Sequence, residues 1–260
     1  MNRFEGKVVI VTGAGSGIGA GTARRFLKEG AFVILNGRRK HKLQETIKGF
    51  DATKSLVHPG DVSDEKYVKR LVKDTVAKFG KLDVLVNNAA TAIFGPFVKT
   101  TTQDWRKVMT TDLDSVYFAC REALPHLLKT KGSIINLSSA SGLGGDWGMS
   151  AYNAAKGAVT NFTRALALEY GSQGVRINAV APSLTTTEAT ADLQKSDALM
   201  AAFRDRLPIG RAATPEDIAG VIAFLASEDA RFVNGAILSV DGGLHASNGQ
   251  PNFLSLLGQG

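Results

Sequence analysis

The sequence predicts an α/β fold, a doubly wound parallel sheet of about seven strands with helices on both faces. Short apolar runs alternate with longer segments of helical periodicity along the 260-residue chain. The apolar runs lack polar alternation, as expected for strands that are buried on both faces of a sheet. A glycine-rich loop directly follows the first run and opens a helical pattern, which is the order that begins a βαβ unit.

The expected elements follow from these patterns. Seven segments are predicted as strands: 7–11, 32–35, 55–58, 84–86, 133–137, 176–180 and 236–240. Five segments between them are predicted as helices: 19–29, 65–79, 103–128, 154–170 and 215–226. This continuous alternation predicts one domain over residues 1–260, with a lid-like, Thr-rich insertion at 183–207 and a C-terminal tail at 244–260. The apolar end of the tail favours packing against another subunit.

Composition excludes some classes of protein. Lys and Arg outnumber Asp and Glu by 31 to 24, a formal charge of +7, but the basic residues are scattered and no nucleic-acid-reading motif is found. We therefore expect no nucleic acid partner and favour an anionic small molecule. Apolar runs of strand length predict no membrane segment. The single cysteine, Cys120, cannot form an internal disulfide, so a cytoplasmic location is expected.

The loop Thr12–Gly19 has the pattern of a phosphate cradle. Glycines let the backbone turn tightly and approach a pyrophosphate, whose charge then lies on the amides at a helix N-terminus. The alternative is a plain tight turn, but the position between a strand and a helix favours a dinucleotide site. The residues expected to contact the cofactor here are Gly13, Gly15, Ser16, Gly17, Ile18 and Gly19.

The end of the second predicted strand favours NADP(H), with NAD(H) as the alternative. An acidic residue there binds a ribose 2′-hydroxyl, whereas an arginine binds a 2′-phosphate. This chain has no carboxylate at that point and places Arg38 and Arg39 after Gly37. The two arginines could instead be solvated residues at a helix start. Asp61, after the third strand, is placed either to accept a hydrogen bond from adenine or to cap a turn.

Tyr152 and Lys156 are candidates for proton chemistry. Their spacing of four places them on one face of a helix. A free tyrosine has a pKa of about 10, and a neighbouring ammonium favours the phenolate. Such a tyrosine could deliver a proton to the oxygen of a carbonyl substrate. Ser139, after the predicted strand 133–137, can offer a hydroxyl to that oxygen. The pair alone is common, but together with the serine and the glycine loop it predicts an enzyme that interconverts an alcohol and a carbonyl with a nicotinamide cofactor.

On these residues the chain resembles the short-chain dehydrogenases/reductases over essentially its whole length, in their single-domain Rossmann form. The matching motifs lie at 12–19, 61–62, 87–90, 138–139, 152–156, 182–183 and 241–243. The resemblance implies that Tyr152 is the general acid/base and that Lys156 binds the nicotinamide ribose and assists the tyrosine. It implies that Ser139 orients the carbonyl and that Thr187 holds the carboxamide.

The resemblance also implies further contacts and an assembly. Val62, Asn88, Ala89 and Pro182 are expected to shape the cofactor cleft, and the long fourth and fifth helices are expected to form a homotetramer. One position departs from the family pattern. Asp112 stands where the family usually has an asparagine, whose main chain holds a water of a proton relay behind the lysine. The relay through Asp112 is therefore in question, whereas hydride transfer is not.

The substrate is expected to be a small alcohol or ketone. The segment 139–148 and the tail resemble the bacterial meso-2,3-butanediol dehydrogenase (acetoin reductase) branch, which implies a vicinal diol or an acetoin-like hydroxyketone. Trp147 in this segment is expected to face the substrate, or else to plug a strand end. Alternatives are a sugar or polyol dehydrogenase and a 3-oxoacyl-[acyl-carrier-protein] reductase. A non-catalytic nicotinamide sensor would be expected to lack Tyr152 or Lys156.

Overall fold

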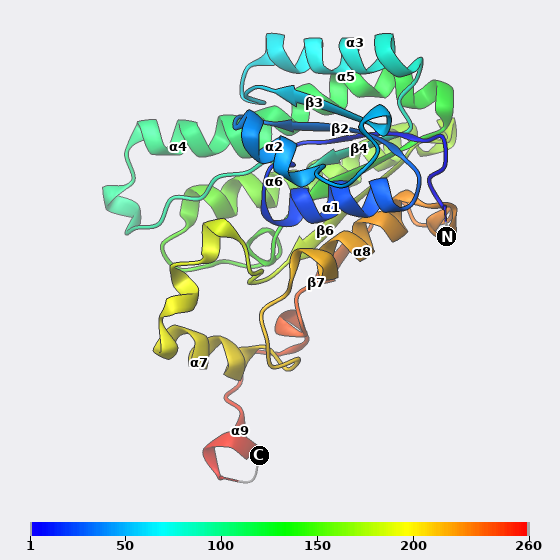
Figure 1. The fold of residues 1–260 in the computed structure, drawn as a ribbon. Helices are drawn as coiled ribbons and strands as arrows, with labels where there is room; N and C mark the ends of the chain where they lie inside the picture. Colours follow the sequence, from blue (N-terminus) through cyan, green and yellow to red (C-terminus); the bar gives the residue numbers. More distant parts are fainter. Residues whose placement is uncertain (1, 259–260) are drawn as a thin grey trace.

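The predicted sheet is confirmed in a computed structural model that describes residues 2–258. Its strands pair in parallel, in the order β3-β2-β1-β4-β5-β6-β7 (Figure 1). The strands are β1 (Val8–Val11), β2 (Phe32–Gly37), β3 (Ser55–Pro59), β4 (Val84–Asn87), β5 (Ser133–Leu137), β6 (Arg176–Pro182) and β7 (Ile237–Val240). The direction of winding reverses between β1 and β4, the topology at which open α/β sheets form a crevice.

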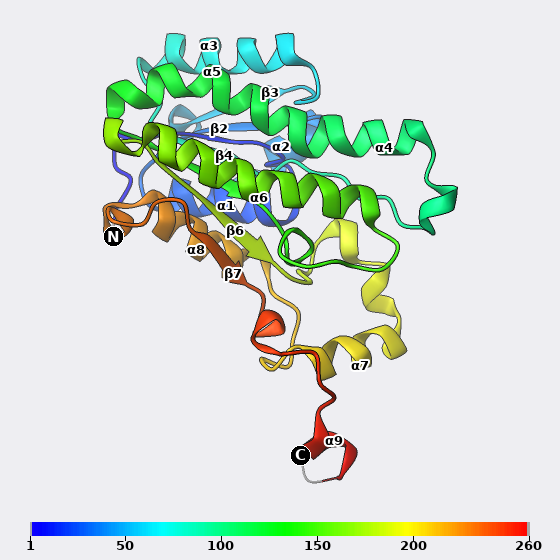
Figure 2. The same cartoon turned by 180° about the vertical axis from the view of Figure 1, so that it is seen from behind.

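Both faces of the sheet are covered, which explains the continuous apolar runs. Along β1, Val8 and Ile10 belong to the core on one face, and Val9 and Val11 belong to the core on the other face. Helices α3, α5 and α6 pack on the first face, and α1, α2 and α8 pack on the second (Figures 1 and 2). Strand β1 therefore contributes alternate side chains to two separate cores.

The helices begin and end near local capping signals. Asp64 caps α3 at the amide of Lys66, and Thr214 forms a capping box with Asp217 at the start of α8. The α-helices are α1 (Gly17–Lys28), α2 (Lys40–Thr46), α3 (Glu65–Phe79), α4 (Thr102–Met109), α5 (Ser115–Thr130), α6 (Ser150–Tyr170), α7 (Asp197–Arg206), α8 (Pro215–Ala226) and α9 (Phe253–Leu256). The 3₁₀ turns are η1 (Ala52–Lys54), η2 (Phe97–Lys99), η4 (Ala140–Gly142), η5 (Gly171–Gln173), η6 (Glu188–Thr190), η7 (Leu193–Lys195), η8 (Glu228–Ala230) and η9 (Leu244–Ala246).

The helix expected at 103–128 differs from the prediction in its middle. It is divided into α4 and α5 by a π-helical turn, η3 (Thr110–Asp114). A π turn accommodates one extra residue and changes the direction of the side chains that follow it. Helix α2 was not predicted, because its seven residues have no side-chain cap and are too few to establish a helical period.

The insertion at 183–207 contains the turns η6 and η7 and helix α7. Its first residues approach the glycine loop, since a Cβ on Gly17 would lie 2.9 Å from Cγ2 of Thr187. The tail that follows η9 leads to α9, which projects away from the sheet (Figure 1). Residues 259–260 of the predicted tail lie outside the described residues. Within residues 2–258, no helix is long and apolar enough to span a membrane.

Candidate active site

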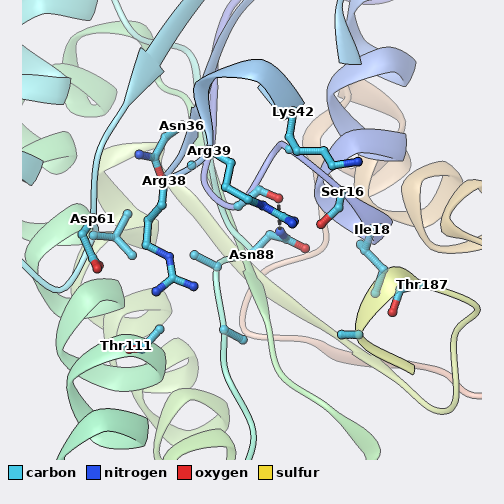
Figure 3. Close-up of a pocket in the computed structure, with 18 of the residues that line it drawn as sticks. Ser16, Ile18, Asn36, Arg38, Arg39, Lys42, Asp61, Asn88, Thr111 and Thr187 are labelled. Atoms are coloured by element: carbon cyan, nitrogen blue, oxygen red, sulfur yellow. Dashed lines mark hydrogen bonds between the residues drawn. The ribbon is translucent and has the colours of Figure 1, made fainter. Parts of the chain in front are cut away.

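A cavity of about 320 Å³ lies at the carboxyl ends of β1, β2 and β4, where the winding of the sheet reverses (Figure 3). The glycine loop forms one wall and the residues after β2 form the next. Residues from the loops after β3 and β4, from η3 and from the insertion complete it. Most residues predicted to bind a cofactor line this cavity: Gly13, Gly15, Ser16, Gly17, Ile18, Arg38, Arg39, Asp61, Val62, Asn88, Ala89 and Thr187.

The glycine loop is held from both sides. Thr12 Oγ1 accepts hydrogen bonds from the amides of Asn88 (2.9 Å) and Ala89 (3.1 Å), and Asn88 Nδ2 donates to the carbonyl of Thr12 at 2.8 Å. The amide of Ala14 donates to the carbonyl of Asn36 on β2 at 2.8 Å. These bonds tie the loop to β2 and to the segment after β4, so the cavity wall is built by contacts between strands.

The loop leaves no room for side chains where it approaches its neighbours. A Cβ on Gly13 would lie 2.7 Å from Asn88 Nδ2, and one on Gly19 would lie 2.3 Å from the carbonyl oxygen of Gly13. Gly13 and Gly17 also have positive φ angles of 66° and 51°. Ser16 stands at the N-cap of α1 with no side-chain cap bond, so the first amides of the helix face the cavity. Backbone amides without an intrahelical partner, next to glycines that have no side chains, fit a dinucleotide pyrophosphate.

Cations gather at the end of β2. Arg38, Arg39 and Lys42 all line the cavity, and the Arg38 side chain extends between Asp61 and Thr111 (Figure 3). Arg39 binds Glu188 of the insertion with two hydrogen bonds of 3.1 and 2.7 Å. These bonds raise the pKa of the guanidinium and lower the pKa of the Glu188 carboxyl. The two neighbouring arginines thus differ, because within residues 2–258 Arg39 forms an ion pair with a carboxylate and Arg38 does not.

Asp61 forms the turn that the sequence offered as one alternative, and it also lines the cavity. Its Oδ1 accepts hydrogen bonds from the amide (3.0 Å) and hydroxyl (2.9 Å) of Ser63, so it forms a turn before α3. The same residue lines the cavity beside Val62, which is buried. Asp61 can therefore hold the turn before α3 and line the cavity at the same time.

A second cavity of about 200 Å³ adjoins the first. The two share Ile18, Asn88, Ala90 and Thr187 as lining residues. The second cavity brings together Ser139, Tyr152, Lys156 and Pro182, which come from the ends of β5 and β6 and from α6. The catalytic candidates and the glycine loop thus lie along one continuous crevice.

Lys156 is almost completely buried in this crevice. Its Nζ donates a hydrogen bond to the carbonyl of Leu137 at 2.9 Å, lies 3.6 Å from Oδ2 of Asp112, and lies 5.5 Å from the centre of the Tyr152 ring. Tyr152 is half-buried on the same face of α6. The ammonium therefore lies between a phenol and a carboxylate. The phenol is on the same helix, four residues before Lys156, and the carboxylate comes from Asp112 in η3.

Asp112 is fully buried in the π-helical turn. Its Oδ1 accepts a hydrogen bond from the amide of Thr91 at 2.8 Å, whereas Oδ2 has no hydrogen-bond partner among the described residues. Burial raises the pKa of this carboxyl, and the charge of Lys156 opposes the shift. Asp112 therefore contributes its side chain, and not only its main chain, to the surroundings of Lys156.

Ser139 begins a short polar chain that the sequence did not reveal. Its Oγ accepts a hydrogen bond from the amide of Ser141 at 3.2 Å and contacts the Ser141 hydroxyl, which in turn contacts Asp146. The amide of Asp146 donates to the side chain of Asn153 on α6 at 2.9 Å. This chain fixes the loop after β5 against the helix that carries Tyr152.

The sequence left one alternative for Trp147 that the structure excludes, and it did not indicate three residues at or next to the crevice. Trp147 is 94 % exposed and lines neither cavity, so it does not plug the end of a strand. Lys42 of α2 and Thr111 of η3 line the first cavity, and Glu188 of the insertion reaches it only through its bond to Arg39. The position of Lys42 one helical turn after Arg38 was a usable signal, but it required recognition of the short helix α2.

The described residues include no cluster of three or more His, Cys, Asp or Glu side chains that could hold a metal ion. The crevice brings together a phenol, an ammonium with a buried carboxylate behind it, hydroxyls and backbone amides. These groups can move a proton and can stabilise negative charge on an oxygen.

Comparison with known proteins identifies the family. A family model described as enoyl-(acyl carrier protein) reductase matches residues 13–245. The chain is 47 % identical to the meso-2,3-butanediol dehydrogenase of Serratia marcescens, over 97 % of this chain and 100 % of that protein. It is 40 % identical to the glucose 1-dehydrogenase of Gluconobacter oxydans, over 94 % and 93 % of the two chains. It is 38 % identical to the NADP-dependent (R)-specific alcohol dehydrogenase of Lentilactobacillus kefiri, over 94 % and 99 %.

These relatives are named as dehydrogenases and match the chain over nearly their full length, and the resemblance noted in the sequence is therefore confirmed. The chain belongs to the short-chain dehydrogenase/reductase family, and it is an oxidoreductase that acts on CH–OH groups with a nicotinamide cofactor.

Proposed function

We propose that the protein reduces a small ketone, or oxidises the corresponding alcohol, with a vicinal diol or an acetoin-like hydroxyketone as the substrate class. The observation that carries the proposal is the meeting of Tyr152, Lys156 and Ser139 in one small cavity that adjoins the glycine-lined crevice. A volume of about 200 Å³ favours a compact substrate. The 47 % identity to a meso-2,3-butanediol dehydrogenase supports the same class.

In this proposal the chain moves a proton. Tyr152 gives its phenolic proton to the carbonyl oxygen during reduction and removes the hydroxyl proton during oxidation. The buried ammonium of Lys156, beside the ring, stabilises the phenolate that forms. Ser139 donates a hydrogen bond to the substrate oxygen, and its link to Ser141 holds its position. The bound cofactor supplies or accepts the hydride.

We propose NADP(H) as the favoured cofactor, with NAD(H) as the alternative. The loop from Gly13 to Gly19 would hold the pyrophosphate, and Asn88, Ala89 and Val62 would line the adenosine and ribose portions. Arg38 and Arg39 offer guanidiniums just after β2, whose own residues Phe32–Gly37 include no carboxylate. The Lentilactobacillus kefiri relative, an NADP-dependent alcohol dehydrogenase 38 % identical to this chain, supports this choice.

At the nicotinamide end we propose that Lys156 also binds the ribose and that Pro182 and Thr187 hold the carboxamide side. All three line the second cavity, next to Tyr152. We further propose that the chain acts as one domain whose insertion at 183–207 closes over the crevice. We also propose that Trp147, which is exposed and lies outside the small cavity, contacts a part of the substrate that extends out of it.

A sugar or polyol is the second candidate substrate. The relative named glucose 1-dehydrogenase, at 40 % identity, is the observation that favours it. A 3-oxoacyl-[acyl-carrier-protein] reductase would use the same residues, and the family model matched is described by an acyl-carrier-protein activity. A sensor without chemistry is the least favoured alternative, because Tyr152 and Lys156 are both present and adjacent.

The test combines substrates, cofactors and one variant. Initial rates are measured with diacetyl, acetoin, glucose and a 3-oxoacyl thioester, each with NADPH or NADP⁺ and with NADH or NAD⁺. The Tyr152→Phe variant is expected to lower turnover by roughly 10²–10⁴-fold, because the general acid/base is lost. Its cofactor affinity, measured by nucleotide fluorescence, should stay near that of the wild type. Turnover of the variant near the wild-type level would contradict the mechanism. Activity of the wild type with glucose alone would contradict the proposed substrate class and leave the mechanism unchanged.

We also propose a cytoplasmic homotetramer. The single cysteine, Cys120, is buried and hydrogen-bonded by Asn87, so it offers no thiol for a disulfide on the surface. Burial raises the pKa of this thiol to about 12, which makes it unreactive in the folded protein. Exposed apolar side chains such as Leu168 on α6 and Leu238 on β7 support the tetramer.

A further inference from the structure

A buried carboxylate lies behind the proposed catalytic lysine. Asp112 is 0 % exposed, and its Oδ2 has no hydrogen-bond donor among residues 2–258. An uncompensated carboxylate oxygen in the protein interior is costly, so a charge close to it is required. The charge that faces Oδ2 is the ammonium of Lys156, at 3.6 Å.

The π-helical turn determines where this carboxylate points. Asp112 is the middle residue of η3, between α4 and α5. Its Oδ1 is held by the amide of Thr91, at 2.8 Å, in the segment that follows β4. One oxygen is therefore fixed by the backbone, while the other is directed at α6, where Lys156 lies. Single π turns recur at functional sites for this reason.

Among residues 2–258, no second carboxylate forms an ion pair with the ammonium of Lys156. The described chain gives Lys156 one ion pair, with Asp112. From β5 it receives the carbonyl of Leu137, at 2.9 Å, and from its own helix it faces the Tyr152 ring. The other residues that line the second cavity include no charged or titratable side chain. The three groups thus form a row of phenol, ammonium and carboxylate.

We propose that Asp112 is a positioning residue that acts through Lys156: its carboxylate holds the ammonium from behind and offsets part of the positive charge that Tyr152 experiences. The inference rests on the proposed roles of Tyr152 and Lys156. It assigns to the Asp112 side chain a function that an uncharged residue at this position cannot perform, namely to set the pH range in which the phenol exchanges its proton.

The sign of the effect follows from charge alone. A positive charge beside a phenol favours the phenolate, and a negative charge behind it weakens that preference. Replacement of Asp112 by asparagine removes the negative charge, so the phenolate forms at lower pH. Alcohol oxidation needs the phenolate, and ketone reduction needs the phenol. Both pH profiles should therefore move in the same direction, toward lower pH.

The test is the Asp112→Asn variant, which keeps an oxygen for the amide of Thr91 and removes only the charge. We expect the acid limb of kcat/KM for oxidation and the alkaline limb for reduction to move down by roughly half a unit to one pH unit. Asp114→Asn is the matched control, since Asp114 lies in the same turn and has no ion pair in the described chain. It should leave both limbs unmoved.

The outcomes separate charge from structure. A uniform loss of activity with unmoved limbs would mean that Asp112 only supports the fold, and limbs that move upward would overturn the proposed sign. Either result rejects the proposed role of Asp112. A loss of turnover in Tyr152→Phe would still support the proposed role of Tyr152 as general acid/base. An independent readout needs no substrate: the ultraviolet titration of tyrosinate, taken as the difference between each protein and its Tyr152→Phe counterpart, should move down in Asp112→Asn. An unmoved titration would also reject the inference.

Discussion

Arg38 and Arg39 are neighbours in the sequence, but their guanidiniums have different surroundings. Arg39 is bound by both oxygens of Glu188, whereas Arg38 extends along the cavity toward Asp61 and Thr111 (Figure 3). A guanidinium that already contacts a carboxylate must exchange that partner before it binds a phosphate. Arg38 therefore has the larger share in any recognition of a 2′-phosphate.

This difference leads to a prediction for a single side chain. Arg38→Ala should weaken NADPH binding by roughly 10- to 100-fold, since a charge-assisted hydrogen bond to phosphate is lost. NADH binding should change little, because NADH lacks the phosphate. Fluorescence titration of both nucleotides measures the two affinities, and Arg39→Ala is the matched control with a smaller expected effect. An equal loss for both nucleotides would show that Arg38 contacts a part that they share.

The residues that the sequence predicted most successfully are those with strong local spacing. Tyr152 and Lys156 meet because four residues make one helical turn, and Ser139 joins them because β5 ends beside α6. Residues that enter from elsewhere could not be predicted. The contact between Arg39 and Glu188 joins positions 149 residues apart, and nothing in either local sequence indicates it.

At the scale of elements, the strands were predicted well because burial on both faces leaves an unmistakable apolar run. The predicted ends of the strands were less accurate. Strand β2 continues to Gly37 and β6 to Pro182, and both of these residues line the crevice. The π turn η3 was missed because one extra residue barely disturbs a helical pattern of hydrophobicity. Its position nevertheless decides where Asp112 points.

The contact between α2 and the insertion leads to a prediction about these two elements. Glu188 on η6 holds Arg39 at the start of α2, so the insertion is attached to the ribose side of the crevice. Glu188→Gln should free Arg39 for a 2′-phosphate and raise NADPH affinity by roughly two- to fivefold, the range expected when an exposed ion pair is removed. NADH affinity should not rise.

Asp192→Asn provides the control for this prediction. Asp192 forms an exposed ion pair with Lys195 in the same insertion, at 2.7 Å, and its removal changes the net charge equally. A similar gain in NADPH affinity for both variants would indicate a general charge effect. A gain for both nucleotides in Glu188→Gln would indicate that the pair restrains the insertion without regard to the phosphate.

At the scale of the whole molecule, the order of the strands brings the site together. The winding reverses between β1 and β4, and the crevice opens at the carboxyl ends of these strands, as the topology requires. This location could be predicted from the alternation of strands and helices alone. The assembly could not, because an interface is specified by exposed side chains that a periodicity argument does not place.

Two separate apolar faces support the homotetramer. On the face of α5 and α6, Tyr117 and Leu168 are exposed, and Figure 2 shows these helices uncovered on that side. At the opposite boundary of the sheet, Phe224 on α8 and Leu238 on the edge strand β7 are exposed. One self-complementary face gives a dimer, whereas two faces give a tetramer with dihedral symmetry. An edge strand with an exposed leucine is also a surface that proteins usually cover.

Light scattering at micromolar concentration tests this assembly through its two faces. The wild type is expected to be a tetramer, and Leu168→Glu and Leu238→Glu should each give dimers, because each buries a charge in one interface and leaves the other intact. The double variant should be a monomer. Val98→Glu adds the same charge at an exposed apolar position on η2, outside both faces, and should remain a tetramer. A wild-type monomer would contradict the assembly, and tetramers in both single variants would show that other surfaces form it.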